Sequence, residues 1–190
     1  VYTLKKFSDR DIENIIITRP TVSTEDNGFL PGSIDEKLEP WVAPINGCIQ
    51  SILKQSNDSM TVGNSLEIYE QFTKTNSLEI VPLTYMRGRT FIDSFIIVDE
   101  AQNMTLEQTM MVISRVGNNS KMVICGDSEQ IDLKRKSDSG SWFLNKLVED
   151  ELVGKISLET NHRHPLVDSI LKKYDEYKNS ERVSGILKIM

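Results

Sequence analysis

Residues 95–104 read FIIVDEAQNM, a short apolar run that ends in two adjacent carboxylates and then turns polar. The first four residues are bulky or β-branched and show no polar alternation, so they predict a strand buried on both faces in a parallel sheet. Asp99 and Glu100 follow at the carboxyl end of that strand. Because ligands of open α/β sheets bind outside the carboxyl ends of the strands, we expect both acids to meet solvent and substrate.

This acidic pair suits phosphate chemistry. Asp99 can hold Mg²⁺ through water, while Glu100 can orient and partly deprotonate a water molecule that attacks a terminal phosphate. An apolar strand followed by such a pair is the arrangement of a Walker B motif. The simpler alternative is a helix N-terminus that carries acids only because the helix dipole favours negative charge there.

Length and composition indicate one globular domain over residues 1–190, with 38% apolar and 26% charged residues. No apolar run approaches the roughly 20 residues of a membrane span, and no basic segment with an apolar core opens the chain, which predicts a soluble, cytoplasmic protein. The net charge of −6 argues against binding nucleic acid by bulk electrostatics, so any such contact is expected to be local. Cys48 and Cys125 lie inside apolar stretches and are predicted to be buried hydrophobic residues.

Strand and helix patterns alternate along the chain. Strands are predicted at 14–18, 79–83, 95–98, 121–125, 155–158 and 185–190. Helices are predicted at 33–55, 66–72, 105–116, 142–148 and 166–177. Capping boxes open the first and third of these helices, and two prolines, Pro40 and Pro44, are predicted to break or kink the first. This alternation specifies an α/β layered fold with a mainly parallel sheet flanked by helices.

A second polar signature follows the strand predicted before it, in the heptad GDSEQID at residues 126–132. Neighbouring parallel strands would direct this heptad into the same crevice as Asp99 and Glu100. Gly126 would let the backbone approach a phosphate closely, and Gln130 could hydrogen-bond the γ-phosphate or the attacking water without adding charge. The alternative is a turn cap, because Asp and Gly are ordinary turn residues.

A third polar corner, LETNHRHP at residues 158–165, carries Arg163. A guanidinium stays charged and donates two parallel hydrogen bonds to phosphate oxygens, so Arg163 is a candidate contact for the γ-phosphate. A surface ion pair with an acidic residue is the alternative. His162 and His164 have no cysteine or third histidine nearby, which argues against a metal site at this corner.

Two dense basic spots interrupt the acidic chain. Arg87 and Arg89, in RGRT, immediately precede the strand that carries the acidic pair and could reach a phosphate of nucleotide or nucleic acid. The second spot, KRK at residues 134–136, reads as a solvated loop. A solvated loop is also the alternative for RGRT.

Several of these motifs together resemble the PhoH-like family, in the same order and over almost the whole chain. They are TRP at 18–20, GFLPG at 28–32, RGRTF at 87–91, DEAQN at 99–103, SKMVICGDSEQIDL at 120–133 and HRHPLV at 162–167. The resemblance implies a RecA-like P-loop ATPase core related to superfamily 1 helicases. It also implies an association with RNA metabolism, and sometimes fusion to a PIN ribonuclease domain.

The resemblance assigns roles to individual residues. Asp99 matches the Mg²⁺ ligand and Glu100 the catalytic base. The other matched positions are the DEAQ glutamine, the third helicase motif and the arginine before HPLV, namely Gln102, Gly126, Asp127, Gln130 and Arg163. Of these, Gln130 and Arg163 are implied to be catalytic. The implied cofactors are ATP and Mg²⁺, and the implied partners are RNA or single-stranded nucleic acid and, in the parent protein, further copies in a ring.

One family feature is missing. The phosphate-binding loop GxxxxGK[ST] occurs nowhere in the chain. In the family this loop precedes the strand that ends in TRP, so we expect the sequence to be the carboxy-terminal part of the ATPase domain. In RecA-like strand order, the missing strand would lie between those at 121–125 and 155–158. We therefore expect the 190-residue chain alone to bind ATP poorly, and the parent protein to hydrolyse it.

Two other functions are compatible with the same residues. A metal-dependent nuclease could hold two Mg²⁺ ions between Asp99, Glu100, Asp127 and Asp132. A non-catalytic interaction module is compatible with the missing phosphate-binding loop.

Overall fold

The computed structural model describes residues 11–20, 34–55, 70, 72–158, 164–167, 169–174 and 176–177. The chain divides into two compact units, residues 1–149 and 150–190. The strand predicted at 185–190, most of the helix predicted at 66–72, and the Ser33 cap of the first predicted helix lie outside the described residues.

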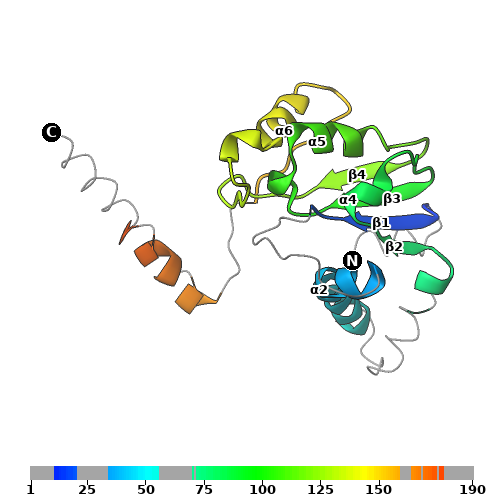
Figure 1. Cartoon of the computed structure of the whole chain (residues 1–190), viewed down its shortest axis with the longest axis horizontal. Coiled ribbons are helices and arrows are strands. Elements are labelled where there is room, and N and C mark those ends of the chain that lie inside the picture. Colours follow the sequence, from blue (N-terminus) through cyan, green and yellow to red (C-terminus); the bar gives the residue numbers. More distant parts are fainter. Residues whose placement is uncertain are drawn as a thin grey trace. The chain divides into compact units, whose positions relative to one another are not determined.

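A parallel sheet forms the centre of the first unit (Figure 1). Its strands are β1 (Asn14–Thr18), β2 (Leu78–Ile80), β3 (Ser94–Val98) and β4 (Lys121–Ile124). The strand order is β2-β1-β3-β4, and every neighbouring pair is parallel. The predicted α/β class with a parallel sheet is therefore confirmed.

Helices cover both faces of this sheet, with α2 on one side and α4, α5 and α6 on the other (Figure 1). Their bounds are α2 (Ile34–Gln55), α4 (Leu83–Met86), α5 (Leu106–Ile113) and α6 (Ser141–Leu147). Two 3-10 turns, η1 (Ala101–Asn103) and η2 (Lys136–Asp138), complete the unit.

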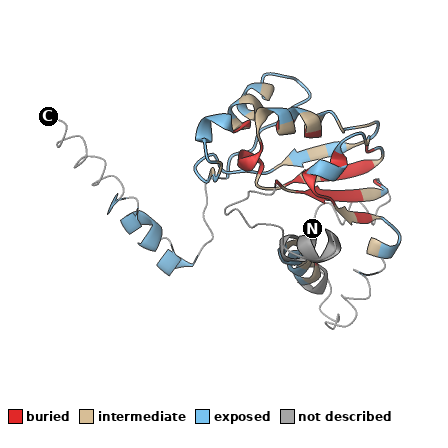
Figure 2. Ribbon diagram, in the orientation of Figure 1, coloured by how far each residue is buried: buried red, intermediate tan, exposed pale blue. Residues whose placement is uncertain are grey.

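Strand alternation divides the core into two layers, because successive side chains of a strand point to opposite faces. One layer joins Ile16, Ile96 and Val98 to residues of α4 and α5. The other joins Ile15, Ile17 and Phe95 to Ile49 of α2. Figure 2 shows the buried residues gathered in β1 and β3. These two central strands fix the position of the polar segments that follow them.

The first helix differs from its prediction, because α2 is continuous through Pro40 and Pro44. Pro44 is exposed, whereas Ile45 and Ile49, one turn apart, pack against the sheet. A proline removes one helical hydrogen bond, and burial of the apolar stripe outweighs that local loss. The predicted break is therefore wrong, and a kink at either proline stays a prediction.

The segment after β2 was also predicted incorrectly as strand. Val81 still donates its N–H to the carbonyl of Ile17 at 2.8 Å, but Pro82 has no N–H and becomes the N-cap of α4. By contrast, the capping box at α5 is confirmed. The Thr105 hydroxyl accepts from the N–H of Gln108 at 3.3 Å, and the Gln108 side chain accepts from the N–H of Thr105 at 2.9 Å.

Strand β4 forms where it was predicted but is not buried. Within the described part of the chain only β3 pairs with it, and Val123 is 41% exposed. Cys125, just after β4, is exposed, as is Cys48 on α2, so the prediction that both cysteines are buried is wrong. The apolar pattern of β4 thus belongs to a strand whose outer edge is open among the described residues.

The second unit contributes helix but no strand in its described residues. Residues 155–158 form neither strand nor helix, and Ile156 and Leu158 are 87% and 92% exposed, so the strand predicted there is wrong. Residues 165–167, 169–174 and 176–177 are helical, as predicted. Within the described parts of the chain, no helix combines the length and apolar character needed to cross a membrane.

Candidate functional site

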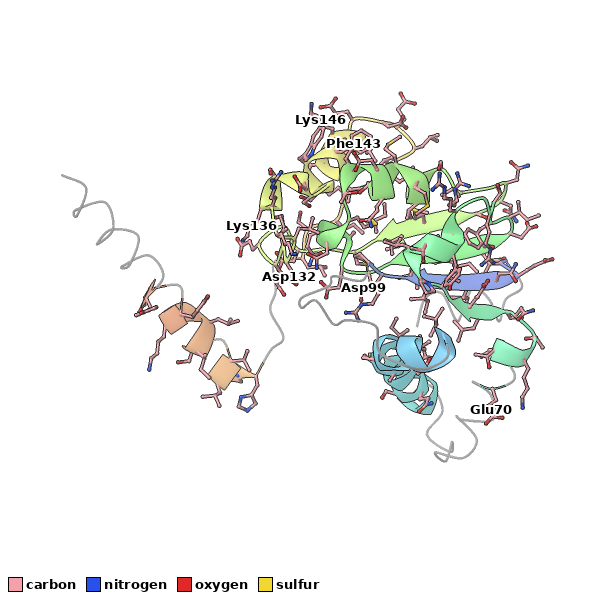
Figure 3. The ribbon with its side chains drawn as sticks, in the orientation of Figure 1. Glu70, Asp99, Asp132, Lys136, Phe143 and Lys146 are labelled. Carbon is pink, nitrogen blue, oxygen red and sulfur yellow. The ribbon has the colours of Figure 1, made fainter. Side chains whose placement is uncertain are left out.

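The carboxyl ends of three strands are level with one another. Thr18 pairs with Val98, and Val98 pairs with Ile124, so the residues that follow the three strands begin at the same edge of the sheet. Hydrogen bonds continue one step further, from the N–H of Asp99 to the Thr18 carbonyl and from the N–H of Cys125 to the Val98 carbonyl, both 2.8 Å. Figure 3 shows Asp99 and Asp132 at one end of the sheet. The predicted convergence of the two polar signatures is thus found in the backbone.

Glu100 adopts a left-handed backbone conformation, with φ 53° and ψ 37°. This region disfavours residues with a Cβ by roughly 1–2 kcal/mol. The turn it makes leads directly into η1, whose first N–H, that of Ala101, donates to the Cys125 carbonyl at 2.9 Å. The strained residue is therefore held between two strand ends.

Gln102 connects the two polar signatures through its side chain, which is 2% exposed. Its Nε2 donates to Oε2 of Glu100 at 2.6 Å and to the backbone carbonyl of Gln130 at 3.1 Å. Its Oε1 accepts from the N–H of Asp127 at 3.1 Å. We call these four residues the Gln102 cluster. The side-chain amide is already hydrogen-bonded to Glu100, Asp127 and Gln130. Gln102 therefore positions these residues of the site.

Gly126 is required by this cluster. A Cβ at this position would lie 2.9 Å from Oε1 of Gln102 and 3.2 Å from the Gln102 backbone nitrogen. The first distance is shorter than real Cβ contacts, so a side chain here would force the Gln102 amide, which is held by three hydrogen bonds, to shift. The sequence suggested that Gly126 would let the backbone approach a phosphate. In the structure, the Gln102 side chain occupies the space beside Gly126 instead.

The segment after Gly126 is a tight polar turn. Oδ2 of Asp127 accepts from Nε2 of Gln130 at 2.6 Å, and Oδ1 accepts from the N–H of Glu129 at 2.9 Å. The side chain of Asp127 is thus a turn cap, which was the alternative reading, while the turn as a whole is joined to the Gln102 cluster. The turn cap is therefore confirmed for Asp127, and the contact of this heptad with a nucleotide stays a prediction.

Asn103 is a site residue to which the sequence assigned no role. It is 5% exposed; its Oδ1 accepts from the N–H of Asp132 at 2.8 Å, and its Nδ2 lies 3.4 Å from Oδ2 of Asp132. Ser139, also buried, donates from Oγ to the Gln102 carbonyl at 2.6 Å. The available signal was the final letter of DEAQN, an amide placed directly after the glutamine.

The charge of Asp99 affects the pKa of the Cys125 thiol. Although the residue as a whole is exposed, partial desolvation of its thiol, together with the negative charge of Asp99, raises the pKa of Cys125 above its ordinary value. Because Val98 pairs with Ile124, the strand register places Asp99 level with Cys125. The Asp99 carboxylate is half-buried and forms no hydrogen bond or ion pair with another described residue.

Arg89 lies elsewhere, at the amino ends of the strands. It donates to both carboxylate oxygens of Glu79, at 2.7 and 2.6 Å, and its guanidinium lies 4.6 Å from the centre of the Phe91 ring. The hydrogen bonds to Glu79 raise the pKa of Arg89. A cavity of about 380 Å³ beside it is lined by Asn14 and Ser94, the first residues of β1 and β3.

The structure therefore does not bring Arg89 to the acidic pair. The reason is that the segment RGRT enters β3 from the end opposite to Asp99, and Glu79 of β2 meets the guanidinium there. Arg87 precedes it as the exposed C-cap residue of α4. The third predicted arginine, Arg163, lies outside the described residues.

Comparisons with known proteins give a consistent result. The family described as PhoH-like protein matches residues 1–175. A PhoH-like protein of Bacillus subtilis is 37% identical over 169 residues, which cover 87% of this chain and 50% of that protein. A PhoH-like protein of Synechocystis is 32% identical over 95% of this chain and 53% of its own length. Protein PhoH of Escherichia coli is 40% identical over 76% of this chain and 39% of its own length.

The chain thus spans about half the length of the curated relatives that it matches. The family match covers both polar signatures and the strands that position them. On this match and on the identities to its relatives, the chain belongs to the PhoH-like protein family.

Proposed function

We propose that this chain is part of an ATP-binding and ATP-hydrolysing domain. The observation that carries the proposal is the position of Glu100, whose carboxylate is held by Gln102 beside Asp99 at the carboxyl edge of a parallel sheet. In folds of this class, that edge is where phosphate-bearing ligands bind. Family membership adds support, because the resemblance implies that Asp99 and Glu100 match the Mg²⁺ ligand and the catalytic base of the family.

Within this proposal, Asp99 holds Mg²⁺. In the described residues no three His, Cys, Asp or Glu side chains are grouped closely enough to hold a metal by themselves. Mg²⁺ fits such a site, because it typically uses one or two carboxylates together with water and substrate phosphates. When bound, the ion would neutralise charge on the transferred phosphate.

Glu100 acts as the general base. One of its oxygens, Oε2, accepts the amide hydrogen of Gln102, which leaves Oε1 to accept a proton from the attacking water. Gln130 is proposed to contact the γ-phosphate or that water, and Arg163 to contact the γ-phosphate. The turn that carries Gln130 is already attached to Gln102, which supports the first of these roles.

The outer edge of β4 is proposed to receive another parallel strand, from the parent protein, that carries the phosphate-binding loop. Two observations support this: the exposed fraction of Val123, 41%, and the level strand ends that β4 shares with β3. A phosphate-binding loop beside β4 would face Asp99 and Glu100 across one strand. This arrangement explains why the 190-residue chain alone is expected to bind ATP poorly.

RNA or single-stranded nucleic acid is the proposed partner of the parent protein, with a homo-oligomeric ring as its proposed form. Both proposals come from the family resemblance. We also propose a cytoplasmic location, which the two free cysteines, Cys48 and Cys125, favour because thiols stay reduced there.

The test uses the full-length parent protein. Glu100→Gln should abolish ATP turnover while Mg-ATP binding, measured by calorimetry, is retained, because the isosteric amide cannot accept the proton of water. Glu129→Gln, the same change at an exposed position of the neighbouring turn, should leave turnover unchanged. Equal turnover in wild type and Glu100→Gln would refute the catalytic role and favour an interaction module.

A metal-dependent nuclease is less well supported. It would need several carboxylates around shared ions, but in the described part of the chain no three such ligands are grouped, and the Asp132 carboxylate accepts from the side-chain amide of Asn103 at 3.4 Å. Cleavage of RNA by the parent protein with Mg²⁺ and without any nucleotide would favour the nuclease over the ATPase.

A further inference from the structure

Arg19 is an arginine with an unusual environment at the same edge of the sheet. It follows Thr18 directly, at the carboxyl end of the central strand β1. Its Nε is buried and has no hydrogen-bond partner, and the same holds for the hydroxyl oxygen of Thr18, a residue that is fully buried. Buried polar groups without a partner are rare and costly, so two at one strand end require an explanation.

The position of Arg19 is fixed by the strand register. Because Thr18 pairs with Val98, Arg19 begins level with Asp99, one strand spacing of about 5 Å away. Yet the guanidinium is not neutralised by that neighbour. Among the residues that the structure describes, no ion pair contains Arg19.

The charge around this edge makes a cation useful. Four acidic residues, Asp99, Glu100, Asp127 and Asp132, lie at the strand ends or on the turn joined to them. A triphosphate brought to this edge would be repelled by them unless positive charge is also present. A guanidinium fixed at the end of a central strand supplies such a charge without reorganisation at the moment of reaction.

We propose that Arg19 binds the terminal phosphate of the nucleotide, and that a phosphate oxygen accepts the hydrogen bond for which Nε of Arg19 has no partner within the chain. This inference rests on the proposed ATP binding and adds a residue to it. Arg89 is unsuited to the role, because Glu79 holds it at the opposite end of the strands. A planar guanidinium suits a phosphate because it donates in a fixed fork.

The experiment measures nucleotide binding by the full-length protein in the Glu100→Gln background, which separates binding from turnover. Arg19→Gln should weaken Mg-ATP binding by roughly tenfold or more and Mg-ADP binding by less than about threefold, because ADP lacks the contacted group. The Mg-ATP affinity of Arg19→Lys should lie between those of wild type and Arg19→Gln, because lysine keeps the charge but lacks the forked donor geometry. Lys74→Gln, which removes a charge from an exposed surface pair, is the matched control and should change neither affinity.

A second measurement separates ligand binding from a structural role. Arg19→Met should leave the thermal unfolding midpoint of the nucleotide-free protein unchanged or higher, because it removes an unsatisfied buried nitrogen. A lower midpoint with unchanged Mg-ATP affinity would overturn the proposal in favour of a structural role. Equal losses for ATP and ADP would overturn the assignment to the terminal phosphate.

A third experiment measures the binding of a single-stranded oligouridine RNA to the same variants. If Arg19→Gln weakens RNA binding and lowers its salt dependence while Mg-ATP affinity is unchanged, the contact is with an RNA phosphate and the proposal is wrong. If the wild-type parent protein neither binds nor hydrolyses Mg-ATP, the proposed function fails, and this inference fails with it. Wild-type turnover with unaltered binding in Arg19→Gln refutes the inference alone.

Discussion

The side-chain amide of Gln102 donates to Oε2 of Glu100 across 2.6 Å, from a position that is 2% exposed. This hydrogen bond joins a buried amide to a carboxylate at the candidate catalytic edge. The same amide binds the backbone of Asp127 and Gln130, so the orientation of Glu100 and the position of the following turn depend on one side chain. Any movement of that turn would therefore reach Glu100 through Gln102.

Replacement of Gln102 tests how much stability this connection supplies. Gln102→Leu should lower the free energy of unfolding by about 2–4 kcal/mol, because it leaves buried polar groups of three partners unsatisfied. Gln102→Glu should cost more, since it places a carboxylate beside Glu100 in a buried position. Urea denaturation of the chain measures both, with Gln50→Leu on α2 as the control. A loss below about 0.5 kcal/mol for Gln102→Leu would contradict the role of the cluster.

Gly126 provides a steric test of the same contact. Gly126→Ala should destabilise the chain by roughly 1–3 kcal/mol, because its Cβ would meet Oε1 of Gln102 at 2.9 Å. The matched control is Gly47→Ala on α2, where a Cβ meets nothing within 4 Å. That substitution should stabilise the helix by about 0.5–1 kcal/mol. Urea denaturation should therefore show changes of opposite sign in the free energy of unfolding for the two variants. Changes of the same sign would refute the steric explanation.

The reactivity of Cys125 should report the charge of Asp99. In a Cys48→Ser background, Asp99→Asn removes a negative charge, which lowers the pKa of Cys125 and raises the thiolate fraction at pH 8. Alkylation by iodoacetamide should accelerate several-fold. Asp93→Asn, which removes a charge just before β3 at its other end, should not change the rate. Equal rates in wild type and Asp99→Asn would show that the two side chains do not interact.

The raised pKa of Cys125 also has a consequence for stability. The folded chain keeps the thiol proton at pH values where the unfolded chain has lost it. The resulting stabilisation is complete below the ordinary thiol pKa and is lost as the pH rises through the folded pKa. Cys125→Ser should therefore flatten the fall of stability on the alkaline side, as measured by urea denaturation at a series of pH values.

The Arg89–Glu79 pair offers a test at the opposite end of the sheet. A double-mutant cycle with Arg89→Met and Glu79→Met should give a coupling of about 0.5–1 kcal/mol that decreases with added salt, because both side chains are partly exposed. The comparison is the Lys74–Glu70 pair, with side chains 75% and 61% exposed, for which about 0.3–0.5 kcal/mol is expected. Equal couplings would show that the bidentate geometry of Arg89 adds nothing.

Short sequence patterns determined the elements whose local and tertiary requirements agree. The apolar runs at β1 and β3 specified central strands, and the reciprocal capping box specified the start of α5. The acidic pair after β3 followed from the same run, because a side chain that follows a parallel strand must lie at its carboxyl end. These features depend on neighbours in the sequence, which the sequence displays directly.

Tertiary structure decided which side chains meet. The burial of β4 depends on a partner at its outer edge, and the pairing of Arg89 depends on the position of Glu79 on another strand. Likewise, Gln102 binds a turn that lies far along the chain, and Arg19 stands level with Asp99 only because β1 and β3 share one register. Contacts of this kind are set by strand order and register, and no periodicity within a single segment contains that information.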